Sequence, residues 1–131
     1  MKRLLFAAVL LAFACLPAKA EMSVPEGERV TLQAVMQNYI DRNLVDGAML
    51  ELDEATGKVR PLYPTTAHPM IETLGRYYYL CANFRDEQGK EVMVNFFVAR
   101  DQDNYVIFHT NTGVNEQLEH LIEKNSTVSS N

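Results

Sequence analysis

The chain contains 131 residues, of which 12 are basic and 17 acidic, so its formal net charge is −5 at pH 7. An acidic balance disfavours binding to nucleic acid or to an anionic membrane surface, because both carry negative charge. The length suits one domain with a modest hydrophobic core, rather than several domains.

The first twenty residues have the features of a secretory signal peptide. Lys2 and Arg3 precede an apolar run at 4–16, and Ala18-Lys19-Ala20 places small residues at the cleavage positions. The run has thirteen residues, whereas a membrane span needs about 20. We therefore expect cleavage after Ala20, a periplasmic or secreted location, and no membrane span in the mature chain.

Two alternatives to this processing remain open, an uncleaved anchor and a lipoprotein acylated at Cys15. Ala12 stands where a lipobox usually has a branched aliphatic residue, which disfavours the lipoprotein. Cleavage after Ala20 removes three of the 12 basic residues and leaves 9 against 17 acidic ones, a net charge of −8. Cys81 is then the single cysteine, so we expect no internal disulfide.

The mature chain begins with a polar segment at 21–29, which we expect to be a flexible leader. An amphipathic helix is predicted at about 31–44, with Thr31 placed to cap its N-terminus. The apolar residues of this helix recur at i, i+3, i+4, i+7 and i+8, at Leu32, Val35, Met36, Tyr39 and Ile40.

After Gly47 the apolar residues alternate with polar ones, which is typical of strands. Turn sequences rich in Asp, Asn and Gly separate the strands. We expect Pro61 at a sheet edge or a bulge, and an irregular loop at 64–70. The expected strands lie at about 48–53, 58–63, 75–85, 91–100 and 105–110, followed by a short helix at about 115–124 and a disordered tail at 125–131.

This order of elements predicts one α+β domain over residues 30–124. The N-terminal helix is expected to pack on an antiparallel meander of four to five strands, with a short helix at the C-terminus. Both faces of the strands at 75–85 and 91–100 are apolar or aromatic. The second face must therefore be covered by the C-terminal helix, by a second subunit or by a ligand.

The helix followed by a meander resembles the cystatin-like α+β arrangement. The segments 46–63 (DGAMLELDEATGKVRPLY) and 84–100 (FRDEQGKEVMVNFFVAR) resemble small exported bacterial proteins of unknown function. The resemblance implies a curved-sheet binding module. Cystatin protease inhibitors carry a Gln-x-Val-x-Gly hairpin that is absent here, so inhibition of papain-like proteases is not implied.

The sequence carries no motif of the common enzyme or cofactor classes. We therefore identify no catalytic residue and no cofactor site. We also expect no metal site, because the possible ligands His68, His109 and Cys81 lack metal-ligand spacing. The acidic pairs Asp53-Glu54 and Asp101/Asp103 fall in predicted hairpin turns. The preference of turns for acidic residues explains them better than a role in acid–base catalysis does.

The favoured interpretation is a non-enzymatic exported module that binds an unknown protein partner or a second copy of itself. The alternative is a small enzyme or a small-ligand carrier, with a pocket between helix and curved sheet lined by His68, Tyr78 and His109. The candidate contact residues are His68, Tyr77, Tyr78, Tyr79, Phe97 and His109.

Overall fold

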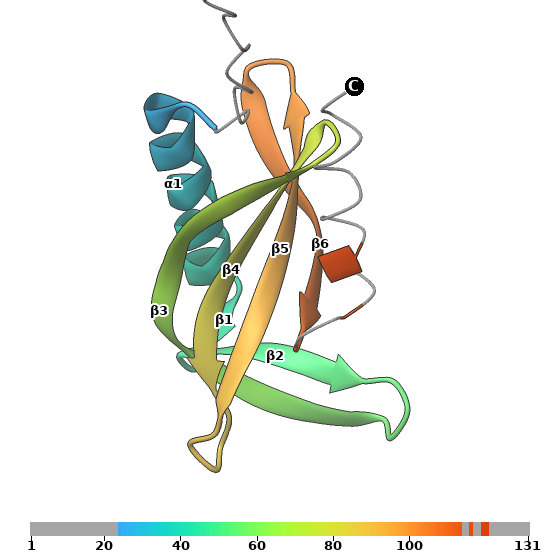
Figure 1. Ribbon diagram of the computed structural model, residues 1–131. Helices are drawn as coiled ribbons and strands as arrows, with labels where there is room; N and C mark the ends of the chain where they lie inside the picture. Colours follow the sequence, from blue (N-terminus) through green and yellow to red (C-terminus); the bar gives the residue numbers. More distant parts are fainter. Residues whose placement is uncertain (1–23, 114–115, 117–118, 121–131) are drawn as a thin grey trace, which may run out of the picture.

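The computed structural model describes residues 24–113, together with residues 116, 119 and 120. In this part of the chain one helix, α1 (Glu26–Arg42), is followed by six antiparallel strands in chain order (Figure 1). The strands are β1 (Leu44–Val45), β2 (Ala48–Asp53), β3 (Lys58–Leu74), β4 (Tyr77–Arg85), β5 (Glu91–Asp101) and β6 (Asn104–Thr112).

The expected α+β class, a helix followed by an antiparallel sheet, is confirmed. The sheet has six strands rather than the expected four to five. The short helix expected at about 115–124 is not among the elements of the structure, and most of that range lies outside the described residues. The expected signal peptide at 1–20 and the expected disordered tail at 125–131 also lie outside them.

Helix α1 begins at Glu26, inside the segment at 21–29 that was expected to be a flexible leader. The ring of Pro25 fixes a φ of −55° just before the helix. Glu26 and Glu28 lie in the first turn, where the helix dipole favours acidic side chains. Thr31 is therefore not the cap. Its hydroxyl lies within the helix and donates to the carbonyl oxygen four residues earlier, at 3.0 Å.

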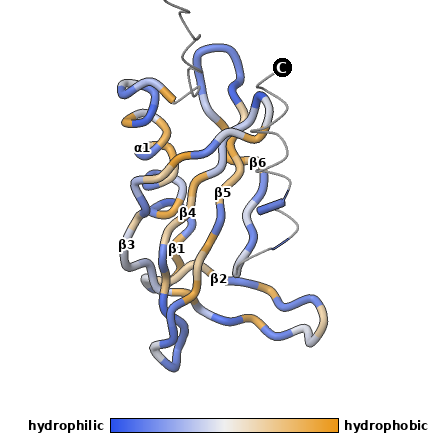
Figure 2. Tube along the Cα trace, viewed as in Figure 1, coloured by the Kyte–Doolittle hydropathy of each residue, from blue (hydrophilic) through white to orange (hydrophobic). Residues whose placement is uncertain are grey.

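The hydrophobic core lies between α1 and one face of the sheet. Leu32, Met36 and Ile40, members of the predicted apolar stripe, are all buried. They pack against a cluster of strand residues that includes Phe84 and Phe96, both fully buried. Figure 2 shows apolar positions recurring along α1, β4 and β5. Close packing of this kind supplies most of the stability of a small domain.

Strand β3 is seventeen residues long and changes partner along its length. Residues 58–62 pair with β2, and residues 63–74 pair with β4. The prediction of an irregular loop at 64–70 is therefore wrong. This segment is part of a strand, with bulges between Pro64 and Thr66 and between Ala67 and Ile71. Among the described residues, each half of β3 pairs with a neighbour on one side. The strand can therefore contain prolines at 61, 64 and 69, which lack a backbone N–H for a second neighbour.

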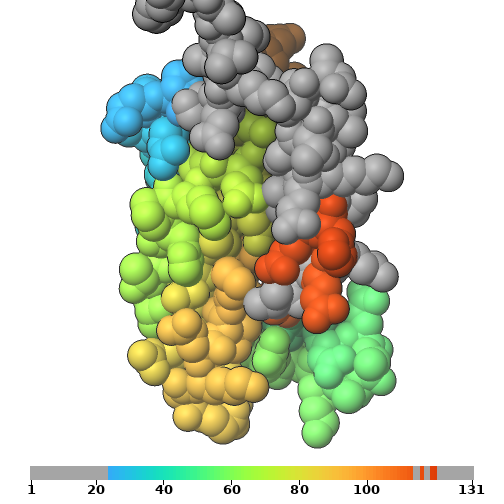
Figure 3. Space-filling model, in the orientation of Figure 1, coloured from blue at the N-terminus to red at the C-terminus, as the bar shows by residue number. Residues whose placement is uncertain are grey.

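The β2–β3 hairpin projects from the rest of the sheet (Figures 1 and 3). One side of this arm exposes Leu50, Leu52 and Val59, each by more than half. The other side carries the Glu51–Arg60 ion pair. The hydroxyl of Thr112 donates to Glu51, which links the arm to the end of β6.

Candidate functional site

Five aromatic rings gather on the face of the sheet opposite α1, and we call this set the aromatic face. Neighbouring rings lie with centroids 5.4 to 6.4 Å apart, within the range in which aromatic pairs attract each other. Phe97 is the centre of the cluster, because it contacts three of the other rings. The members are Tyr77, Tyr79, Phe97, Phe108 and His109.

A β-bulge in β6 places Phe108 in this cluster. Phe97 lies opposite His109 and Val98 lies opposite Ile107, so Phe108 is an additional residue in the ladder. Two consecutive side chains, those of Phe108 and His109, therefore both lie on the aromatic face. Phe97 beneath them is only 6% exposed, whereas Phe108 is 53% exposed. The bulge thus presents a large apolar ring to solvent.

A buried asparagine gives this face a rigid base. Asn95 is 1% exposed, and its carbonyl oxygen accepts a hydrogen bond from the Tyr79 hydroxyl at 2.8 Å. Its amide donates to the side-chain oxygen of Asn111 at 2.8 Å and to the carbonyl of Gly113 at 2.9 Å. A polar network that is fully satisfied in the interior fixes the positions of its members.

Cys81 lies buried on the same face, in surroundings that make its thiol unreactive. Burial raises the pKa of its thiol, with a further contribution from the Glu72 carboxylate. A thiol with a raised pKa is protonated at neutral pH and is a poor nucleophile. Burial also raises the pKa of Tyr79 to about 12, and Glu119 contributes to this increase. These shifts weigh against a cysteine nucleophile at this surface.

The structure brings together four of the six candidate contact residues, namely Tyr77, Tyr79, Phe97 and His109. Sequence reasoning missed Phe108, because regular alternation places every second residue on a face and a bulge interrupts that alternation. The triple tyrosine divides between the two faces, since neighbouring strand residues point to opposite sides.

Tyr78 lies on the α1 side, where its hydroxyl donates to Glu28 Oε1 at 2.5 Å. Tyr105 donates to the same oxygen at 2.7 Å. These two hydrogen bonds lower the pKa of Glu28, because they stabilise its ionised form. Burial, followed by the bond to Glu28, raises the pKa of Tyr78 to about 12. The three side chains attach the first turn of α1 to the sheet.

His68 braces strand β3 against its neighbours. Its Nε2 lies 2.8 Å from Oδ1 of Asn83, and its carbonyl oxygen accepts a hydrogen bond from Gln33 in α1 at 2.8 Å. His68 is not among the residues whose rings form the aromatic face.

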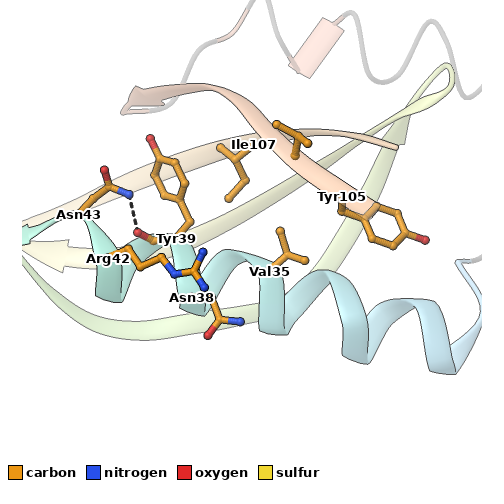
Figure 4. Close-up of a pocket in the computed structure, with 8 residues that line it drawn as sticks. Val35, Asn38, Tyr39, Arg42, Asn43, Tyr105 and Ile107 are labelled. Carbon is orange, nitrogen blue, oxygen red and sulfur yellow. Dashed lines mark hydrogen bonds between the residues drawn. The ribbon is translucent and has the colours of Figure 1, made fainter. Parts of the chain in front are cut away.

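A groove of about 300 Å³ lies between α1 and β6 (Figure 4). Its volume is at the lower limit for small-ligand sites. Tyr105 lies at one end, and Arg42 and Asn43 lie at the other. The lining residues are Val35, Asn38, Tyr39, Arg42, Asn43, Tyr105, Val106 and Ile107. The predicted pocket residues His68, Tyr78 and His109 are not in this lining.

Among the described residues, no group of three or more His, Cys, Asp and Glu side chains is placed to hold a metal ion. The described part of the chain contains no helix with the length and apolar character needed to cross a membrane.

The comparisons with known proteins give the chain no relative. No family model, no curated protein and no solved structure matches it.

Proposed function

We propose that the mature protein is an exported binding module that attaches to another protein and catalyses no reaction. The observation that carries this proposal is the aromatic face. Its exposed ring, Phe108, is 53% accessible and rests on Phe97, above the hydrogen-bonded base around Asn95. Large, rigidly held aromatic side chains are the residues that most often dominate binding at protein interfaces.

The exposed part of Phe108 is large enough to matter for affinity. A phenylalanine buries about 150–250 Å² when it is fully enclosed, so its 53% exposure leaves about 100 Å² available to a partner. At about 25 cal/mol per Å² this area is worth up to about 2.5 kcal/mol, which sets an upper limit of about seventyfold in the dissociation constant. Tyr77 and His109 beside it provide polar groups at the margin of the contact.

The export signal in the sequence supports a location in which this surface meets extracytoplasmic partners. Cell fractionation and mass spectrometry of the recovered protein test this part of the proposal. We expect a soluble periplasmic or secreted form whose first residue is Glu21. A lipid-modified N-terminus at Cys15 would contradict cleavage after Ala20 and would assign the protein to a membrane surface.

A photo-crosslinking amino acid at position 108, introduced in cells that export the protein, tests the aromatic face. Val59 on the projecting arm is 57% exposed, compared with 53% for Phe108, and is the matched control position. We expect a specific adduct from position 108 that is absent from position 59. With the partner purified, Phe108→Ala should weaken binding more than tenfold and Val59→Ala should not. Equal adducts at both positions, or unchanged binding by Phe108→Ala, would refute the proposal.

A small-ligand carrier is the second candidate, and the groove between α1 and β6 is the observation in its favour. The volume of about 300 Å³ is small for a cofactor-sized ligand. Its lining contains none of the three residues from which a ligand pocket was predicted. The groove therefore supports a carrier function less well than the aromatic face supports protein binding.

A further inference from the structure

Among the described residues, strand β6 is the last strand of the sheet, and β5 is its one paired neighbour. In the described part of the chain, no hydrogen bond joins the backbone of residues 104–112 to any element other than β5. Alternate residues of an edge strand direct N–H and C=O groups outward, where they can pair with an added strand.

The groove described above lies directly beside this edge. It combines apolar side chains from α1, Val35 and Tyr39, with Ile107 from β6 (Figure 4). Its lining on the helix side runs from Val35 to Asn43, the residue after α1, which is about 12 Å at 1.5 Å per residue. An extended chain rises about 3.3 Å per residue, so the groove accepts about four residues. Two of their side chains would point into it.

The two ends of the groove differ in charge. Arg42 lies at one end with Asn38 and Asn43, and it forms no ion pair with any described residue. Beyond the other end, the Glu28 carboxylate already accepts hydrogen bonds from Tyr78 and Tyr105. The amide of Asn43 already donates to the carbonyl of Tyr39 at 2.7 Å, so the Arg42 guanidinium and the Asn38 amide are the groups that suit a carboxylate. The groove is therefore complementary to an apolar segment with an acidic residue at one end.

We propose that the groove between α1 and β6 binds an extended segment of a partner protein, which pairs with β6 as a seventh strand. The segment carries apolar side chains at alternate positions and a carboxylate beside Arg42. Strand addition at an exposed sheet edge next to a helix is an established mode of peptide recognition. This inference goes beyond the proposed function and does not depend on the aromatic face, which lies on the other side of β6.

The orientation of the segment follows from Figure 4, in which β6 runs from the Tyr105 end of the groove toward the Arg42 end. Antiparallel pairs outnumber parallel ones in proteins. An antiparallel segment would enter at Arg42, so its acidic residue lies at its N-terminal end. A suitable probe is the blocked peptide Asp-Thr-Val-Thr-Val-Thr, in which Asp and both valines share one face of the strand. It is labelled at its C-terminal end and measured by fluorescence anisotropy against the mature protein.

Backbone methylation tests the pairing itself. Two further peptides carry N-methyl groups on alternate residues, one in each of the two phases. Only one set of N–H groups faces β6 in an added strand. We expect one phase to lose binding at least tenfold and the other to retain it. Equal binding of both methylated peptides, or no binding by any of the peptides, would overturn strand addition.

A charge reversal tests the role of Arg42. The peptide with Lys in place of Asp should bind two- to fivefold more weakly, the range expected for an exposed ion pair. Arg42→Glu should reverse this preference, and Lys58→Glu, at the distant tip of the β2–β3 hairpin, should leave it unchanged. An unchanged preference in Arg42→Glu would remove the carboxylate from the proposal. A protein dimer that the peptide cannot dissociate in sedimentation would assign the edge to a second copy and overturn the proposal.

Discussion

The carboxylate of Glu28 attaches the start of α1 to the sheet, and its replacement by glutamine gives a quantitative test of this attachment. One oxygen of Glu28 accepts hydrogen bonds from Tyr78 and Tyr105, at 2.5 and 2.7 Å. Glutamine has nearly the same shape and still offers an acceptor oxygen. The Glu28→Gln variant therefore removes the charge while leaving the packing in place.

The size of the effect follows from the two bonds. A hydrogen bond to a charged group contributes about 1.5–3 kcal/mol, whereas one between neutral groups contributes about 0.5–1.5 kcal/mol. If Glu28 were fully buried, replacing two charged bonds by two neutral ones would lower the free energy of unfolding by about 2–3 kcal/mol. Glu28 is only half-buried. Screening by solvent reduces the expected loss to about 1–2 kcal/mol of the free energy of unfolding.

Urea unfolding followed by circular dichroism measures this loss, since the chain has no tryptophan to report by fluorescence. With an m-value of about 1.5 kcal/mol per molar, the midpoint at pH 7 should fall by about 1 M urea. The pKa of Glu28 is lowered in the folded protein from its ordinary value of 4.5. Its contribution is therefore complete above pH 4.5 and is lost as the pH falls through the lower folded pKa.

The difference between the wild type and Glu28→Gln should accordingly shrink below pH 4.5 and be largest at neutral pH. In a background of Tyr78→Phe and Tyr105→Phe, the same replacement should change the midpoint very little, because both hydrogen-bond donors are absent. An equal midpoint of wild type and variant at pH 7, or a difference that grows with acid, would refute the reasoning.

Two further predictions concern the buried polar groups of the aromatic face. Asn95→Leu leaves the Tyr79 hydroxyl, the Asn111 side chain and the Gly113 carbonyl without their partner, so the free energy of unfolding should fall by about 2–4 kcal/mol. Tyr79→Phe removes one hydrogen bond and should lower the free energy of unfolding by about 1 kcal/mol. Equal losses in Asn95→Leu and Tyr79→Phe would contradict the hydrogen-bond network. Cys81 is buried with a raised pKa, so a thiol reagent at pH 7 should label it only after unfolding in guanidinium. Rapid labelling of the folded protein would show that the thiol is accessible.

Local chemistry made the helix face and the hairpins predictable from the sequence. Leu32, Met36 and Ile40 follow the helical period and are buried as expected. The turn after β4 was predicted from its Asp and Gly residues. In the structure, the carboxylate of Asp86 accepts backbone hydrogen bonds from Gln88 and Lys90, at 3.0 and 2.8 Å. Such features depend on neighbours in sequence, so they can be inferred before the fold is known.

Features that depend on distant partners could not be inferred in this way. Pro64 and Pro69 predict a loop, yet β3 continues through both because one side of the strand has no neighbour there. Only the sheet topology supplies that information. The early start of α1 depends on Tyr78 and Tyr105, which lie 50 and 77 residues away from Glu28 in the sequence. The exposure of Phe108 depends on the pairing register between β5 and β6.

The bulge at Phe108 also has a genetic consequence. Side chains alternate regularly on each side of the bulge, with Ile107 and Thr110 both toward α1. Deleting residue 108 would join two segments that are already in phase, so every other side chain of β6 would keep its face. Deleting the single codon for residue 108 would therefore remove one projecting ring without any change in the core residues of β6. Inserting a codon there would add such a ring in the same way. Under the proposed function, such a change would alter the binding surface while the fold stays the same.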